Sequence, residues 1–183
     1  LFRVGRGKLQ ARLLDAPRLD DGSVRPLAFM LIDDTIPDLV TNTPVDMLSG
    51  LTVANFTEDW TPQATISAVG PDGTQTTSFI SSIPPMSIRK IPVRLRTAAP
   101  PEKGKVAFSI ELLETNPDRL LDQRTLELSV RDPDETRRVT FRSNIDGSVQ
   151  YYGLTPADWN QTRIGRPGII LTLHGAGVEA RRQ

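Results

Sequence analysis

The sequence contains no cysteine, a single histidine and few aromatic residues, which make up 5% of the chain. Without cysteine, disulfide frameworks and thiolate chemistry are excluded within these 183 residues. The 22 basic side chains are balanced by 22 acidic ones, so no general electrostatic attraction to nucleic acid or to an anionic membrane is expected. No apolar run approaches the roughly 20 residues that a helix needs to span a bilayer. Partners must therefore be inferred from particular sites.

Prolines and glycines are frequent, with 15 and 13 residues. They separate short segments in which apolar and polar residues alternate, a pattern typical of strands with one buried face. Long amphipathic helical patterns are absent. Residues 1–43 contain one such segment, Lys8 to Leu14, and a second one that Pro26 interrupts. These residues contribute strands whose boundary with the next region the pattern leaves open.

The strand signals are clearest between residues 44 and 135. The expected strands cover residues 51–57, 63–69, 74–80, 87–96, 106–112 and 126–131. A hairpin turn is expected at Gly70-Pro71-Asp72-Gly73, between two of them. Antiparallel strands in this number favour a β-sandwich. We therefore predict a mainly β chain with a sandwich domain over residues 44–135.

Two stretches of this region carry a resemblance. Val53–Thr57 reads VANFT and Ser82–Val93 reads SIPPMSIRKIPV, with a proline-marked corner before a long amphipathic strand. Together they resemble the immunoglobulin-like accessory modules of extracellular bacterial proteins. The resemblance implies an immunoglobulin-like antiparallel β-sandwich and favours an extracellular or periplasmic location.

The pattern changes after residue 135. Residues 137–142 and 148–154 alternate around the turn Asn144-Ile145-Asp146-Gly147, which predicts an antiparallel hairpin. Residues 168–174, Gly-Ile-Ile-Leu-Thr-Leu-His, then form a nearly continuous apolar run of the kind buried on both faces of a parallel sheet. We therefore place a second domain, with a different type of sheet, at residues 136–183.

The apolar run leads into His174-Gly175-Ala176-Gly177, a pattern that indicates a strand, a tight turn and the start of a helix. Glycines at 175 and 177 permit a sharp turn and a close approach of a ligand to the backbone. Backbone N–H groups in such a turn can stabilise the oxyanion of an acyl-transfer transition state, by about 3–4 kcal/mol for each donor.

Residues 136–183 resemble the opening of an α/β-hydrolase, as in prolyl-oligopeptidase-like peptidases and esterases. The resemblance implies that the backbone of Gly175 and Ala176 lines an oxyanion hole, that His174 and Gly177 support the loop, and that the complete protein acts on an ester or peptide. It implies no cofactor or metal. In that family the nucleophile, acid and base follow this loop, and no Gly-x-Ser-x-Gly occurs here. We therefore expect a fragment of a serine hydrolase, truncated after the oxyanion loop and inactive by itself.

Two other functions remain open. The chain can be a non-catalytic carbohydrate- or protein-binding β-module in which the glycine-rich turn is incidental, or a structural spacer. A sugar-binding platform would need Trp60, Trp159, Tyr151 and Tyr152 to gather in space, whereas core or loop anchoring needs no such gathering.

Acidic residues cluster at 20–21, 33–34 and 132–135. Hard cations take several oxygen ligands, but the Asp-x-Asp-x-Asp-Gly spacing of a calcium loop is absent. The spacing therefore favours solvated turns over metal sites.

Overall fold

The computed structural model describes residues 17–30, 35–116, 118–157 and 169–171. These residues form strands and turns without a helix, so none of them belongs to a helix long and apolar enough to cross a membrane. The strands of the described residues are β1 (Leu27–Phe29), β2 (Leu39–Val40), β3 (Val45–Asn55), β4 (Ala64–Val69), β5 (Gln75–Ile80), β6 (Ile88–Thr97), β7 (Gly104–Thr115), β8 (Asp118–Arg131), β9 (Arg137–Arg142) and β10 (Val149–Leu154).

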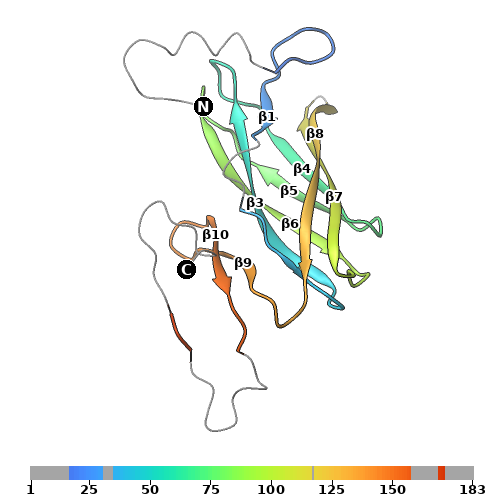
Figure 1. The fold of residues 1–183 in the computed structure, drawn as a ribbon. Helices are drawn as coiled ribbons and strands as arrows, with labels where there is room; N and C mark the ends of the chain where they lie inside the picture. Colours follow the sequence, from blue (N-terminus) through green and yellow to red (C-terminus); the bar gives the residue numbers. More distant parts are fainter. Residues whose placement is uncertain (1–16, 31–34, 117, 158–168, 172–183) are drawn as a thin grey trace.

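Two sheets form the body of the molecule (Figure 1). One has the strand order β1-β3-β6, and the other has the order β2-β8-β7-β4-β5. One hydrophobic core lies between them, and its largest fully buried side chains are Phe108, Leu27, Leu39, Leu51, Ile66, Ile83, Leu95, Ile110, Leu112, Leu121, Leu128 and Val53. The predicted β-sandwich is confirmed, and β1 and β2 are part of its sheets.

The core follows from the alternation of side chains along the long strands. In β6, Ile91, Val93 and Leu95 are buried, while Arg94 and Arg96 between them are exposed. Strands β7 and β8 alternate in the same way. Because each fully buried aliphatic side chain contributes about 1.5–3 kcal/mol, these three strands supply much of the driving force for packing the two sheets.

The predicted turn at residues 70–73 connects β4 to β5. Gly73 has a φ of +81°, a conformation that favours glycine. The carboxylate of Asp72 accepts hydrogen bonds from the N–H groups of Thr74 and Ala98, at 3.0 and 2.7 Å. These bonds, led by the one from Thr74, hold the pKa of Asp72 well below its ordinary value. Asp72 thereby ties the turn to the end of β6.

The side chain of Asn55 joins the end of β3 to two neighbouring loops. Its Nδ2 donates to the carbonyl oxygens of Asp59, Ile83 and Pro84, at 2.8, 3.1 and 2.9 Å. Its Oδ1 accepts from the N–H and the hydroxyl of Thr57, at 2.9 and 2.8 Å. The two stretches that carry the resemblance to accessory modules are therefore bonded to each other through Asn55.

The resemblance to an α/β-hydrolase is wrong. Residues 137–154 do form the predicted hairpin, but β9 and β10 make a separate antiparallel pair beside the sandwich, and the described residues include no helix. The only parallel pairing among these residues is the two-residue contact of β2 with β8. Ile169, Ile170 and Leu171, expected to be buried on both faces of a parallel sheet, are 97%, 91% and 81% exposed. A hairpin and an apolar run are local patterns, and neither the hairpin nor the described part of the run belongs to a parallel sheet.

Candidate functional site

Strands β9 and β10 form a hairpin that local hydrogen bonds close. The N–H of Ser143 donates to the carbonyl of Ser148 at 2.8 Å, and the N–H of Gly147 donates to the carbonyl of Ser143 at 3.0 Å. The carboxylate of Asp146 accepts from the hydroxyl and the N–H of Ser148, at 2.7 and 3.1 Å, and these bonds lower its pKa. With Gly147 at a φ of +71°, the turn is specified by its own residues.

The inner face of the hairpin packs on the sandwich next to β3 (Figure 1). Val149 is buried there, with 2% of its surface exposed. The hydroxyl of Thr140 donates to the carbonyl of Leu48 in β3. The guanidinium of Arg138 lies 4.7 Å from the centre of the Tyr151 ring, a cation–π geometry. Both apolar and polar contacts thus hold the hairpin on the sandwich.

The outer edge of β9 is capped by Asp38. The N–H of Arg138 donates to Oδ2 of Asp38 at 2.7 Å, and the N–H of Asp38 donates to the carbonyl of Arg138 at 3.0 Å. The guanidinium of Arg138 also donates to the carbonyl of Ile36 at 3.4 Å. These bonds fix the hairpin to the segment before β2 and occupy one of its two edges.

Close approach of the hairpin depends on Gly50 in β3. A Cβ at this position would lie 2.9 Å from Cδ of Lys90 and 3.1 Å from Cβ of Val149. The backbone of Gly50 also exchanges two hydrogen bonds with Thr35, at 2.7 and 2.8 Å. Lys90 can move aside, but Cβ of Val149 is held by the strand that carries it.

Replacement of Gly50 by valine is expected to displace the hairpin while the sandwich stays folded. Overpacking of this kind destabilises the packed position of the hairpin by about 1–3 kcal/mol. This free energy corresponds to roughly 5–150-fold faster hydrogen exchange of the β9 and β10 amides. Hydrogen exchange followed by mass spectrometry measures the effect. Ala107→Val, at an exposed position of β7, is the control and should leave these amides unchanged. Unchanged exchange in Gly50→Val would contradict this account of the contact.

The outer face of the hairpin faces solvent and carries four apolar side chains together with Gln150 and Arg137. Because directly paired residues point to the same side, Val139 and Tyr152 share this face with Phe141 and Leu154. The rings of Phe141 and Tyr152 lie with their centres 6.0 Å apart and their planes at 48°. Each of these two residues is 45% exposed. The hairpin therefore presents an aromatic pair on a seated two-stranded sheet.

The outer edge of β10 is open among the described residues, because its pairing there is with β9 alone. In an antiparallel ladder, facing residues that are hydrogen-bonded to each other alternate with facing residues that are not. Ser143 and Ser148 are a hydrogen-bonded pair at the turn. The alternation therefore directs the N–H and C=O groups of Val149, Tyr151 and Gly153 away from β9. We call the outer face, with its four apolar side chains, and this open edge together the hairpin surface.

The sequence predicted the hairpin but not its exposed surface. Strict alternation implies one polar face, whereas β9 and β10 carry apolar residues on both faces: Val149 and Tyr151 on one, Phe141 and Tyr152 on the other. Apolar residues on both faces of a two-stranded element are the signal that could have identified the surface.

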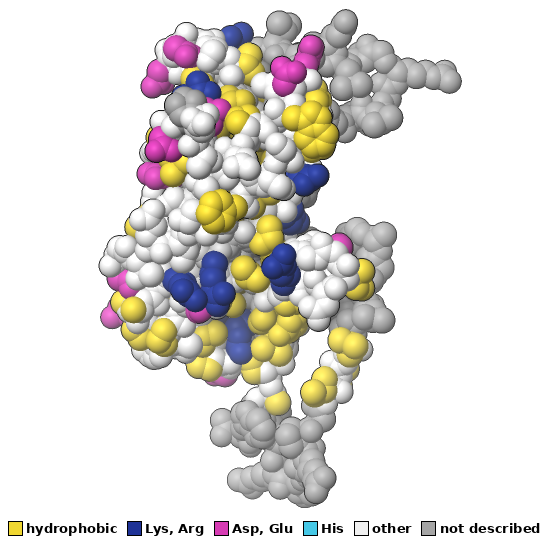
Figure 2. Space-filling model, turned by 180° about the vertical axis from the view of Figure 1, so that it is seen from behind, with side chains coloured by type: hydrophobic (Ala, Val, Ile, Leu, Met, Phe, Trp, Pro, Cys, Tyr) yellow, Lys and Arg dark blue, Asp and Glu magenta, His cyan; other side chains and the backbone are white. Residues whose placement is uncertain are grey.

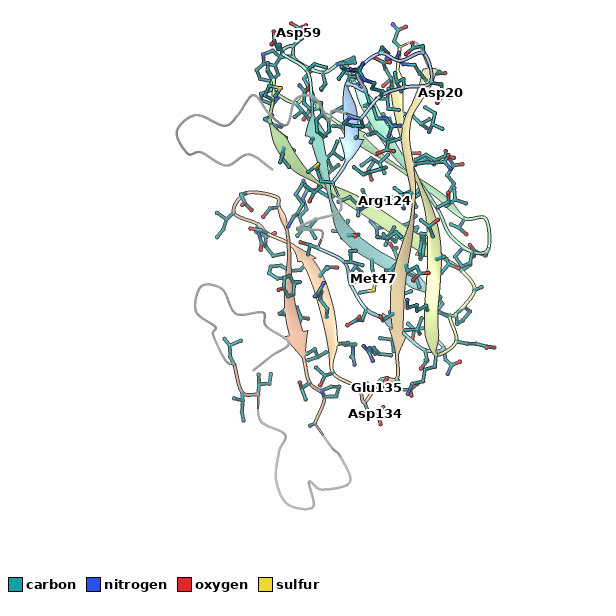
Figure 3. The ribbon with its side chains drawn as sticks, turned by 45° about the horizontal axis from the view of Figure 1, so that its top comes forward. Asp20, Met47, Asp59, Arg124, Asp134 and Glu135 are labelled. Carbon is teal, nitrogen blue, oxygen red and sulfur yellow. The ribbon has the colours of Figure 1, made fainter. Side chains whose placement is uncertain are left out.

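The acidic clusters form ion pairs and turns. Asp132 and Glu135 both contact the ammonium of Lys103, at 2.6 and 3.2 Å. Lys103 lowers the pKa of Asp132, and the N–H of Asp132 together with Lys103 lowers the pKa of Glu135. Figure 3 shows Asp20 at the opposite end of the sandwich from Glu135. Within the described residues no group of three His, Cys, Asp or Glu side chains could hold a metal ion, while residues 33–34 lie outside them.

The aromatic residues considered for sugar binding are not gathered within the part of the chain that the structure describes. Trp60 is 62% exposed and follows Asp59, which lies at the far end of the sandwich from Glu135, where β9 begins (Figure 3). Tyr151 is covered by Arg138 and Tyr152 pairs with Phe141, and Trp159 lies outside the described residues.

A hollow of about 350 Å³ lies where β7 turns into β8. Its lining residues are Thr65, Leu113, Glu114, Thr115, Asp118, Arg119 and Leu120. The carboxylate of Glu114 is buried and pairs with the guanidinium of Arg119 at 2.8 Å. Because these two charges pair with each other, neither is left unpaired to recognise a ligand in the hollow.

The predicted oxyanion loop, His174, Gly175, Ala176 and Gly177, lies outside the described residues. Its proposed role therefore stays a prediction from the sequence, without the hydrolase sheet that motivated it.

Comparison with known proteins identifies no relative by sequence: no family model matches the chain, and no curated protein matches it. Among solved structures, the chain is similar to the CARDB domain of a Pyrococcus furiosus protein, determined in complex with di-metal ions. The two share 16% identity over 54% of this chain and 88% of that domain, with a TM-score of 0.38. A TM-score this low supports no inference about function, so the description of this chain rests on its own β-sandwich and hairpin.

Proposed function

We propose that the chain is a non-catalytic β-sandwich module that binds other polypeptides through the hairpin surface. The observation that carries the proposal is the aromatic pair Phe141–Tyr152, held on a seated hairpin next to an open strand edge. Extended peptides bind such edges by adding a strand, with backbone hydrogen bonds for affinity and side-chain contacts for specificity. Polypeptide is therefore the class of partner that both parts of the surface fit.

The chemistry of the described residues supports binding rather than catalysis. Of the acidic side chains considered as metal ligands, Asp132 and Glu135 form ion pairs with Lys103. A spacer domain would need no seated hairpin with an exposed aromatic pair. Carbohydrate binding would place exposed aromatic rings on one platform, whereas Trp60 and Tyr152 belong to separate parts of the molecule.

Panning of a phage-displayed library of random peptides on the immobilised chain tests the proposal. We expect enrichment of apolar, β-prone peptides, whose binding falls at least about tenfold in Phe141→Ser/Tyr152→Ser, the equivalent of about 1.4 kcal/mol for two truncated interface aromatics. Phe79→Ser is the matched control, because Phe79 is an 84% exposed aromatic on β5, and it should bind as the wild type does. Absence of enrichment, or selective binding on a glycan array, would refute the proposal.

A further inference from the structure

Two features of each copy of the chain are complementary. Ile169, Ile170 and Leu171 form a short apolar segment with more than four fifths of each side chain exposed. This segment stands apart from the sandwich, yellow between grey atoms, in Figure 2. The open edge of β10 and the aromatic pair beside it lack a strand partner among the described residues. One feature is an exposed apolar segment outside the sheets, and the other is a sheet edge without a partner strand among the described residues.

The edge of β10 is unprotected. Edge strands are normally blunted by proline, by charged side chains or by bulges. The sequence of β10, Val-Gln-Tyr-Tyr-Gly-Leu, contains neither proline nor a charged residue, and its register with β9 is continuous. By contrast, Asp38 caps β9, and the hydroxyl of Thr76 in β5 bonds the carbonyl of Arg94 in β6. Among these three edges, β10 is the one that has no such contact within the described residues.

The segment fits this edge chemically. Isoleucine is a β-branched residue that favours strands, and the backbone of a three-residue segment can pair with the outward groups of Tyr151 and of one neighbour, Val149 or Gly153. Side chains on one side of the added strand would then lie next to Tyr152 and Leu154. The exposed aliphatic surface and the half-exposed aromatic pair would be covered in the same step.

We infer that two copies of this chain associate by reciprocal exchange, with Ile169–Leu171 of each copy added as a strand to the β10 edge of the other. This inference rests on the proposed function and names its partner. Donor and acceptor are on the same chain, so one exchange implies a second, and the pair closes with two-fold symmetry. The zero formal net charge of the chain puts no overall repulsion between copies.

The connection is long enough for the exchange. Residues 155–168, between β10 and the segment, number 14, and an extended chain of that length reaches roughly 45–50 Å. A strand of six residues, like β10, is about 20 Å long. The segment can therefore leave its own copy and still align along a neighbouring β10.

The test is the oligomeric state of the full chain, measured by sedimentation velocity over a wide range of protein concentration. We expect a dimer with twice the monomer mass. Ile169→Asp/Leu171→Asp removes the donor, Tyr152→Lys charges the acceptor edge, and both variants should be monomeric. Ile145→Asp is the matched control, because Ile145 is 98% exposed but lies in the β9–β10 turn, and it should dimerise as the wild type does.

A mixture of the two monomeric variants provides the decisive outcome. The donor-defective copy keeps an intact β10 edge, and the edge-defective copy keeps an intact segment, so their mixture should regain a heterodimer with a single exchange. Tyr151 and Gly153 amides should be protected from hydrogen exchange in the wild-type dimer and unprotected in the donor-defective variant.

A wild-type chain that stays monomeric, or a dimer that survives Ile169→Asp/Leu171→Asp, overturns the exchange. Peptide binding that depends on Phe141 and Tyr152 has its own readout in the panning experiment. A wild-type monomer that still enriches peptides therefore overturns the self-association alone. Ile169→Asp/Leu171→Asp leaves the β10 edge free, and failure of this variant to enrich peptides overturns the proposed function.

Discussion

Replacement of Phe108 by alanine is expected to lower the free energy of unfolding by about 3–5 kcal/mol. Phe108 is fully buried in β7, in the core shared by both sheets, where it lies opposite Leu126 of β8. Truncation removes the ring from the core and leaves a cavity that the surrounding strands cannot fill without moving. Because a domain of this size is stabilised by only about 5–15 kcal/mol, the variant should lose a large share of its stability.

Urea unfolding followed by circular dichroism measures this loss as a lower midpoint at an unchanged slope. Phe79→Ala is the matched control, since it removes the same ring from an 84% exposed position of β5. Its effect should stay within about 0.5 kcal/mol. Equal losses in the two variants would contradict the placement of Phe108 in the core.

Asn55→Ala is expected to lower the free energy of unfolding by about 2–4 kcal/mol, because it removes five hydrogen bonds and a typical one contributes about 0.5–1.5 kcal/mol net. The side chain, which is fully buried, serves three carbonyl oxygens and two groups of Thr57. The carbonyl of Ile83 would keep the N–H of Thr61 as a donor, whereas the N–H of Thr57 would lose its acceptor. The loops around Asp59 and Pro84 should then loosen together, which hydrogen exchange of the Thr57 amide reports.

Asn55→Asp separates the two roles of this amide. The aspartate keeps the acceptor for Thr57 but turns a carboxylate oxygen towards the carbonyls of Asp59, Ile83 and Pro84. We expect it to be at least as destabilising as alanine near neutral pH. Asn144→Ala, in the exposed turn of the hairpin, is the control and should change stability by less than about 0.5 kcal/mol. A tolerated Asn55→Asp would mean that the donor bonds contribute little.

The two faces of the hairpin have different roles in the proposed function: the inner face holds the hairpin on the sandwich, and the outer face is the one proposed to bind a partner. Contacts of Thr140, Val149 and Gly50 hold the inner face on the sandwich, which leaves Phe141 and Tyr152 on a supported surface. A surface that is ordered before binding loses less conformational entropy when a partner docks. Gly50→Val should therefore weaken peptide binding as well as loosen the hairpin, although Gly50 is not part of the hairpin surface.

The extent of the strands shows where sequence patterns stop being sufficient. The expected strand at 126–131 is the end of β8, which begins at Asp118. Residues 118–125, Asp-Arg-Leu-Leu-Asp-Gln-Arg-Thr, lack strict alternation, and they become a strand because β7 offers backbone partners from Ser109 to Thr115. Strand formation at such positions depends on a neighbour that is distant in sequence.

The hydrolase prediction failed for a related reason. The apolar run beginning at Gly168 was expected to lie between two layers, but burial depends on what packs against a segment, and the described part of this run is exposed. The hairpin that precedes it was predicted correctly from its alternation and its turn. Its position on β3, and the exposure of its second apolar face, were not.

The sequence by itself determined the β class, the turns at 70–73 and 144–147, and the inward side chains of β6, β7 and the end of β8. These features depend on side-chain alternation and on residues adjacent in the chain, which any correct fold must respect. Tertiary structure alone decided the strand order, the bonds from Asn55, the seat of the hairpin at Gly50 and the exposure of Phe141, Tyr152 and Ile169–Leu171. Each of these depends on contacts between residues far apart in the sequence, and the candidate site is made of such contacts.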